Sequence, residues 1–298
     1  MNGIGWLFRK KSYLCVTKYI YSSVYYTQAL MDVNRVLYIS QEITPYLAPN
    51  ALSTFGRMLP QGIQESGIEV RTFMPRYGCI NERRNQLHEV IRLSGLNIEI
   101  DDADHPLIIK VATLQPSRMQ IYFIDNDDYF LRHAASGLET ETSFEDNDER
   151  SIFYVRGVLE TVKKLRWIPS VIHCTGWITA LSPLYLRKMY ADDPTFNQAK
   201  IVYSLYDHPF EGTFDERMVE KLKMDGFTEE ELKSLTGAPV DFNALNRIAI
   251  DYSDAVAISS ENVSQELIDY AKASGKPLLE YPGEENYVEA YKAFYTSL

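Results

Sequence analysis

The sequence predicts a doubly wound α/β fold, in which helices cover both faces of a mainly parallel sheet. Two observations lead to this prediction: short strand-like apolar runs alternate with amphipathic segments, and glycine or proline often stands between them. Arg35–Ser40 and 68–74 are strand-like, and 52–66 between them has helical spacing and ends at Gly67. Parallel strands joined by helices in this way form right-handed crossovers.

A hairpin is expected to extend one edge of this sheet. Residues 107–114 and Met119–Asp125 are rich in β-forming residues, and the turn-forming sequence Gln-Pro-Ser-Arg at 115–118 separates them. The acidic, polar stretch 125–149 is expected to be a surface loop. The helix expected at 151–166 has apolar residues at helical spacing, so one of its faces should pack on the sheet.

The remaining segments continue the alternation. We expect strands at 171–174, 201–205 and Ala255–Ile258, and helices at 177–190, Phe242–Tyr252, 261–273 and 284–296. Ligands of doubly wound folds bind outside the carboxyl ends of the parallel strands. Those ends are the positions that follow Ser40, Met74, Cys174, Leu205 and Ile258.

The composition disfavours several classes of protein. The chain has 298 residues, and its net charge of −11 disfavours binding to the phosphates of nucleic acids. It contains no run of about 18 apolar residues that could span a membrane. Cys15, Cys79 and Cys174 are widely spaced, which argues against a disulfide framework and a zinc site and indicates a reducing cytoplasm. We expect neither a metal nor a cofactor.

Residues 1–30 differ in character from the rest of the chain. They are basic and rich in tyrosine, and they contain no acidic residue. Lys18 and the tyrosines interrupt the apolar core that a secretory signal needs. We expect a disordered extension. The alternatives are a segment bound to a membrane surface and a protein that starts at Met31.

The loops at the strand ends contain candidate site residues. The loop after the first strand has no glycine or lysine, and Pro45 and Pro49 lack backbone donors, so it is a poor cradle for phosphate. Asp207 and His208 stand together after a later strand and could form a general-base dyad. Neighbouring side chains of an extended loop point in opposite directions, so a structural role stays open. His173, a lone histidine, is expected to be structural.

A set of short motifs follows in order along the chain. The most specific are Met-Pro-Arg-Tyr-Gly at 74–78 and a Trp, Thr-Ala-Leu, Pro-Leu-Tyr pattern within 177–185; others lie at 40–46, 59–60, 146–150, 202–205 and 252–256. Together they resemble the amino-terminal domain of bacterial glycogen and starch synthases, from about Arg35 to Glu266. The resemblance implies one Rossmann-like lobe of a two-lobed glycosyltransferase. It also implies the family reaction, in which glucose passes from ADP-glucose to an α-1,4-glucan with retention.

The chain departs from the family pattern at the strand ends. The family's Lys-Thr-Gly-Gly-Leu is Ala-Pro-Asn-Ala-Leu at 48–52, its His-Asp-Trp-His-Thr is Thr-Gly-Trp-Ile-Thr at 175–179, and its Thr-Ile-His-Asn is Ser-Leu-Tyr-Asp at 204–207. The resemblance therefore implies that the donor-phosphate lysine and the histidine beside the transferred sugar are replaced, and we expect no catalytic residue. The degenerate positions include Ala48, Thr175, Gly176 and Ile178.

The family's second, donor-binding lobe does not fit between the helix expected at 261–273 and the last helix. The last helix resembles the one that crosses back onto the amino-terminal domain in the family, and its aromatic stripe would bury apolar surface. We therefore expect residues 31–298 to form a glycogen/starch synthase-like amino-terminal domain that the helix at 284–296 closes.

These observations lead to three hypotheses. In the first, the chain is non-catalytic alone and binds α-glucan or regulates a full-length synthase. In the second, it is a half-enzyme that uses ADP-glucose when a separate carboxyl-terminal lobe completes it. In the third, it is a small-molecule-binding domain. The candidates for substrate binding are Gln41, Tyr46, Asn50, Trp177, Tyr206, Asp207 and His208.

Overall fold

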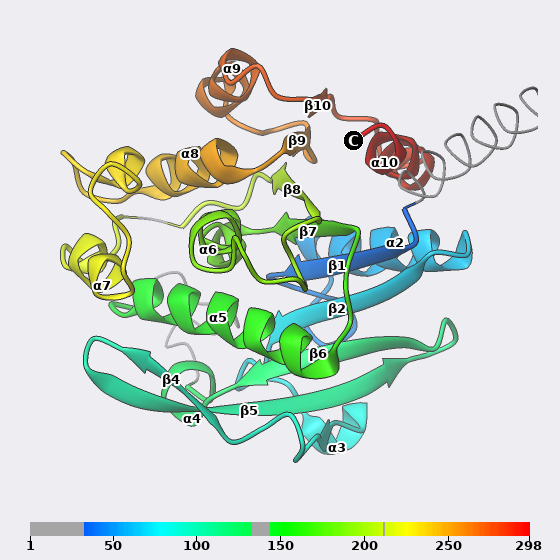
Figure 1. Cartoon of the computed structure of the whole chain (residues 1–298). Coiled ribbons are helices and arrows are strands. Elements are labelled where there is room, and N and C mark those ends of the chain that lie inside the picture. Colours follow the sequence, from blue (N-terminus) through cyan, green and yellow to red (C-terminus); the bar gives the residue numbers. More distant parts are fainter. Residues whose placement is uncertain (1–32, 133–143, 211) are drawn as a thin grey trace, which may run out of the picture. The chain divides into compact units, whose positions relative to one another are not determined.

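A mainly parallel sheet forms the centre of the fold. The computed structural model describes residues 33–132, 144–210 and 212–298, so the expectations for residues 1–30 lie outside the described residues. The strand order in these ranges is β10-β9-β8-β7-β1-β2-β6-β5-β3, with β4 paired to β5 (Figure 1). The parallel strands are β1 (Arg35–Ser40), β2 (Glu69–Pro75), β6 (Met119–Asp125), β7 (Val171–Thr175), β8 (Lys200–Leu205), β9 (Ala255–Ile258) and β10 (Leu278–Leu279).

The expected hairpin is present toward one edge of the sheet. β5 (Ala103–Leu114) runs antiparallel to β6, with Ile109 opposite Ile124, and β6 in turn runs parallel to β2. Two further strands that were not expected, β3 (His88–Glu89) and β4 (Leu96–Ile100), pair antiparallel to β5. The hairpin therefore changes a parallel sheet into a mixed one.

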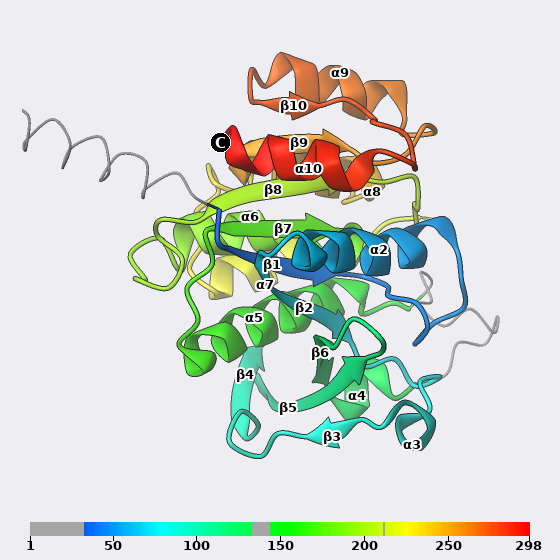
Figure 2. The same cartoon turned by 90° about the vertical axis from the view of Figure 1, so that its right-hand side faces the viewer.

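Helices cover both faces of the sheet, as predicted. On one face lie α2 (Ala51–Glu65) and α10 (Tyr287–Thr296), side by side; on the other lie α5 (Asn147–Leu165), α6 (Ser182–Lys188) and α8 (Phe242–Tyr252), and α9 (Gln265–Ala273) packs against α8 (Figures 1 and 2). Gly62 allows α2 and α10 to approach closely, because a Cβ atom there would lie 2.6 Å from a methyl group of Val288. Among the helices of the described ranges, none is both long and apolar enough to cross a membrane.

The stretch 125–149 is not simply the surface loop that we expected. It contains the short helix α4 (Asp127–Phe130), and α5 already begins at Asn147. The side chain of Asn126 accepts hydrogen bonds from two backbone N–H groups and so caps α4. Tyr129 is 3% exposed, so the aromatic end of this helix belongs to the core.

The single helix expected at 177–190 is divided in two. A 3₁₀ turn covers Trp177–Thr179, and α6 begins only at Ser182, with Pro183 in its first turn. Proline fits the first turn of a helix because the backbone N–H that it lacks would have no partner there. Between 206 and 241, where no element was expected, the chain forms α7 (Met218–Met224) and a second 3₁₀ turn.

Candidate functional site

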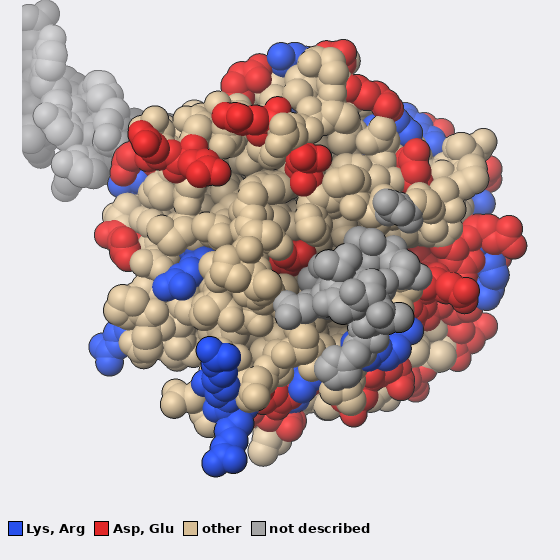
Figure 3. Space-filling model, turned by 180° about the vertical axis from the view of Figure 1, so that it is seen from behind, with Lys and Arg blue, Asp and Glu red and all other residues tan. Residues whose placement is uncertain are grey.

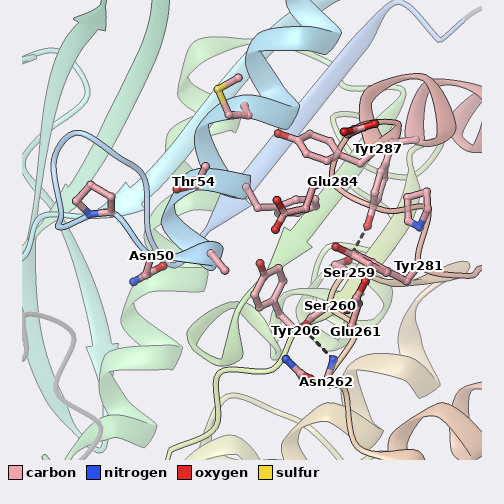
Figure 4. Close-up of a pocket in the computed structure, with 17 residues that line it drawn as sticks. Asn50, Thr54, Tyr206, Ser259, Ser260, Glu261, Asn262, Tyr281, Glu284 and Tyr287 are labelled. Atoms are coloured by element: carbon pink, nitrogen blue, oxygen red, sulfur yellow. Dashed lines mark hydrogen bonds between the residues drawn. The ribbon is translucent and has the colours of Figure 1, made fainter.

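A cavity of about 940 Å³ opens at the carboxyl ends of the parallel strands. Four segments line it: the start of α2, the residue after β8, the residues 259–262 after β9, and the segment 281–287 that leads into α10 (Figure 4). Two of the substrate-binding candidates, Asn50 and Tyr206, lie in this lining. The cavity occupies the position where doubly wound folds bind ligands.

The start of α2 is closed by its own cap. Asn50 has extended backbone geometry, and its side-chain oxygen accepts a hydrogen bond from the backbone N–H of Ser53 at 2.7 Å. The Ser53 hydroxyl in turn accepts one from the backbone N–H of Asn50 at 2.9 Å, which completes a capping box. Because side chains of the protein already accept hydrogen bonds from these backbone N–H groups, the start of α2 has fewer free donors for a phosphate than a glycine-rich loop would have.

Aromatic rings form the apolar side of the cavity. Phe55 lies at their centre, with ring-centroid distances of 5.7 Å to Tyr206, 5.6 Å to Tyr287 and 5.6 Å to Tyr291. Burial raises the pKa of the Tyr206 hydroxyl well above its ordinary value, so this group stays protonated and can donate a hydrogen bond. Flat apolar rings edged with hydroxyl groups suit the faces of sugar rings.

The charged groups of the lining are acidic. Glu261, Glu284 and Glu285 line the cavity, and none of its described lining residues is a lysine or an arginine. Figure 3 looks onto this side of the molecule and shows acidic side chains over its upper part. Carboxylates repel an anionic ligand and accept hydrogen bonds from hydroxyl groups. The lining thus favours a neutral, hydroxyl-rich ligand over a nucleotide diphosphate.

His208 pairs with a carboxylate that the sequence analysis did not select. Its Nε2 lies 3.3 Å from Glu42 Oε1, and the hydrogen bond to Glu42 raises the pKa of His208 despite the opposing effect of burial. Glu42 is 2% exposed, whereas Asp207 is exposed. The ion-pair partner of His208 in the structure is therefore Glu42, which comes from the end of β1, instead of its sequence neighbour.

Three other candidates are buried and do not belong to the lining of the cavity. Gln41 is fully buried, and its backbone carbonyl accepts a hydrogen bond from the Tyr77 hydroxyl at 3.0 Å. Tyr46 packs edge-on against Phe123, and burial raises its pKa to about 12. Trp177 is 2% exposed. Its ring lies 5.5 Å and 5.6 Å from those of two phenylalanines, Phe210 and Phe214.

Three of the four positions that we expected to be degenerate are buried. Ala48 is exposed, whereas Thr175, Gly176 and Ile178 are buried. Gly176 has φ +93°, and a Cβ atom there would lie 2.5 Å from Gln41 Cβ. A larger side chain at Gly176 would therefore displace the end of β1.

A chain of buried polar groups anchors α10 to the sheet. His173 Nδ1 lies 2.6 Å from the Tyr295 hydroxyl, and His173 Nε2 lies 2.5 Å from Ser204 Oγ. The Tyr291 hydroxyl lies 2.6 Å from Ser259 Oγ. Burial lowers the pKa of His173 to about 3, so its ring is neutral and has the structural surroundings that were expected. Because Tyr291 also lines the cavity, α10 supplies part of one wall.

Sequence reasoning missed the wall that precedes α10. Tyr281, Glu284 and Tyr287 line the cavity, whereas the aromatic stripe of the helix expected at 284–296, to which Tyr287 belongs, predicts burial against the core. Residues 259–262 directly follow Ile258, one of the strand ends identified from the sequence, so their position could have marked them as candidates. In the ranges that the structure describes, no group of three or more His, Cys, Asp or Glu residues could hold a metal ion.

A Rossmann-like sheet with a cavity at its strand ends matches the fold of a starch synthase catalytic domain, in which it forms one lobe. The family model of the starch synthase catalytic domain matches residues 35–279. The chain therefore belongs to the starch synthase catalytic domain family.

Curated relatives agree with this assignment. The chain is 38% identical over 193 residues to a glycogen synthase of Chlorobium chlorochromatii, covering 64% of this chain and 40% of that protein. It is 33% identical over 256 residues to a glycogen synthase of Chlorobium phaeovibrioides, covering 85% of this chain and 50% of that protein. The chain thus spans about half the length of the curated relatives it matches.

The fold is also similar to that of the catalytic domain of starch synthase IV from Arabidopsis thaliana, a structure bound to ADP and acarbose. The TM-score is 0.68 at 18% sequence identity, over 84% of this chain and 51% of that chain. At this level of identity the similarity establishes the fold.

Proposed function

We propose that this chain is a glucan-binding domain of glycogen metabolism that does not catalyse glucosyl transfer by itself. The observation that carries the proposal is the lining of the cavity, in which aromatic rings, hydroxyl groups and carboxylates face one space without a lysine or arginine among the described lining residues. Rings that pack on sugar faces and acceptors for sugar hydroxyls are the groups that recognise a neutral glucan.

The same cavity argues against binding of a nucleotide sugar by this chain alone. Transfer from ADP-glucose builds negative charge on the leaving diphosphate, and a site for it needs cations or free backbone donors. Here Asn50 caps the start of α2, and Glu261, Glu284 and Glu285 would face the diphosphate. Removal of one such electrostatic group typically costs about 2.7–4 kcal/mol of transition-state stabilisation.

Titration with two ligands tests this proposal. Maltoheptaose is expected to shift amide NMR signals of Tyr206 and of the segment 281–287, and ADP-glucose is expected to leave them in place. Tyr287→Ala should weaken the binding of maltoheptaose at least tenfold, because it removes an aromatic wall. Tyr252→Ala, which removes a tyrosine outside the lining, is the matched control and should bind like the wild type. Tighter binding of ADP-glucose than of maltoheptaose would contradict the proposal.

A second candidate function is a half-enzyme that a separate donor-binding lobe completes. The observation in its favour is that the family match ends at residue 279, while the chain covers only about half of its relatives. Mixing the chain with the carboxyl-terminal half of a relative and measuring incorporation of labelled glucose into glycogen tests it. Turnover that depends on both polypeptides would support this function over the first.

A further inference from the structure

We propose that Glu42, which does not line the cavity, is a positioning residue that holds two of its walls together through Asn50 and His208. The expected effect of Glu42 on glucan affinity rests on the proposed function, because glucan binds tightly only if the two walls are correctly spaced. The geometric part of the inference, the tie between two chain segments, stands on the structure alone.

Glu42 reaches both walls from the end of β1. Its Oε2 accepts a hydrogen bond from Asn50 Nδ2 at 2.6 Å, and its Oε1 lies 3.3 Å from His208 Nε2. Asn50 caps α2 and lines the cavity. On the other side, the backbone N–H of His208 donates to the carbonyl of Tyr206 at 3.0 Å, so the position of His208 is coupled to that of Tyr206. One carboxylate therefore joins the Asn50 wall to the Tyr206 wall.

The burial of Glu42 makes this tie energetically significant. A carboxylate that is 2% exposed needs a charged or hydrogen-bonding partner to offset its desolvation. His208 supplies a cationic partner when its ring is protonated, and Gln41 Nε2 adds a neutral donor at 3.3 Å from Glu42 Oε1. Hydrogen bonds to ionised groups are about twice as strong as neutral ones, so the tie depends on the charge of the imidazole.

The charges around His208 fix the direction of the pH dependence. Glu42, which follows β1, and Asp207, the sequence neighbour of His208, face His208; both raise its pKa, while burial opposes them. Tyr77 lies near Glu42 and stays neutral, because burial raises its pKa well above the ordinary value. Since the pKa of folded His208 is raised, the tie is complete below about pH 6.5 and weakens as the pH rises through the raised value.

The test uses the full chain, maltoheptaose as the probe, and pH values from 5.5 to 8.5. In the wild type, affinity should fall about fivefold as the pH rises through the pKa of His208. Glu42→Gln keeps the shape but removes the charge, and it should bind about tenfold more weakly and show a flat profile. His208→Gln should also give a flat profile. Glu89→Gln, on the exposed edge strand β3, removes the same charge elsewhere and should retain the profile of the wild type.

A second measurement separates this inference from the proposed function. The pKa of the His208 ring, followed by NMR without any ligand, should be higher in the wild type than in Glu42→Gln. Equal values would overturn the positioning role, even if maltoheptaose binds. If maltoheptaose binds to no variant but the pKa differs, the proposed function fails and the tie stands. If Glu42→Gln does not fold, His208→Gln replaces it as the test. The inference would be overturned if the affinity of His208→Gln depended on pH in the same way as that of the wild type.

Discussion

The two sides of the sheet bury their polar groups in different ways. Beneath α10 the buried polar groups are neutral: the imidazole of His173 and the hydroxyl groups of Tyr38, Tyr291 and Tyr295 contact one another or the nearby serines. Between α5 and α7, in contrast, the ammonium group of Lys221 is enclosed by carboxylates.

The ionic side is also buried, and its charged groups contact one another directly. Lys221 Nζ lies 2.7 Å from Asp148 Oδ2, 2.6 Å from Glu149 Oε1 and 3.2 Å from Asp215 Oδ2. The side chains of Lys221 and Asp148 are 2% and 0% exposed. A buried ion pair is costly to break, because the partner that remains has an uncompensated charge, whereas a neutral network loses less when one hydroxyl is removed.

The largest effect is expected for Lys221→Met. This change removes the cation but retains the bulk of the side chain, and it leaves Asp148 and Glu149 without their counter-charge. We expect the free energy of unfolding to fall by about 3–5 kcal/mol at pH 7 in urea titrations. Burial already raises the pKa of Asp148, so the deficit should shrink at pH 4.5, where a protonated carboxyl needs no counter-charge. A deficit below about 1 kcal/mol at pH 7 would contradict this account of the ionic side.

His173 should make the neutral side sensitive to acid. Its pKa is about 3 in the folded chain and about 6.5 when unfolded, so the unfolded state takes up the proton first as the pH falls. Stability is therefore lost between about pH 6.5 and 3, by about 5 kcal/mol in total. His173→Phe should be less stable at pH 7 but should lose less between pH 6.5 and 4 than the wild type. His88→Gln, an exposed control, should leave the slope unchanged, and equal slopes in all three proteins would refute the prediction.

Removal of a single hydroxyl from the neutral network should have a moderate effect. Tyr295→Phe leaves His173 Nδ1 and the Tyr38 hydroxyl without this partner, and we expect a loss of about 1–3 kcal/mol in thermal or urea unfolding. Tyr252→Phe removes a hydroxyl of a half-buried ring and should cost less. If the two variants are equally stable, the network does not anchor α10 in the way the geometry indicates.

The smallest effect is expected for Arg217→Ala, next to the cluster on the ionic side. Arg217 donates to both oxygens of Asp101, but the pair is exposed to solvent. Exposed ion pairs are screened by water and salt, so the unfolding midpoint should stay within experimental error. A clear loss of stability, especially one that persists in 0.5 M salt, would show that exposure does not separate strong from weak pairs in this chain.

Strands such as Arg35–Ser40 and Ala255–Ile258 followed from the sequence because their apolar runs can be recognised locally, whereas β3, β4 and β10 were not expected. The short helices α4 and α7 could not be predicted, because the polar stretches around them resemble loops. Their positions depend on contacts of Tyr129 and Lys221 with residues distant in the sequence. Local propensity says little where a tertiary contact decides the structure.

The candidate site was predictable only in part. Asn50 and Tyr206 follow marked strand ends, and the structure brings them to one cavity. Glu42 was not distinguishable from its neighbours, because its role depends on His208, which is 166 positions later in the sequence. The aromatic stripe correctly predicted that Tyr291 and Tyr295 are buried, but it did not predict that Tyr287 lines the cavity. Tyr287, Tyr291 and Tyr295 are four residues apart and share one face of α10, so periodicity alone does not separate the ring at the start of the helix from the two buried rings.

The hydroxyl contact between Tyr38 and Tyr295 joins residues that are 257 positions apart. A ribosome must therefore synthesise nearly all of this chain before its first strand can meet the helix that covers it. Until then the apolar surface under α10 is open to water, and contacts between distant residues form slowly. We expect the nascent chain to depend on chaperones at a stage when most of its sheet could already be assembled.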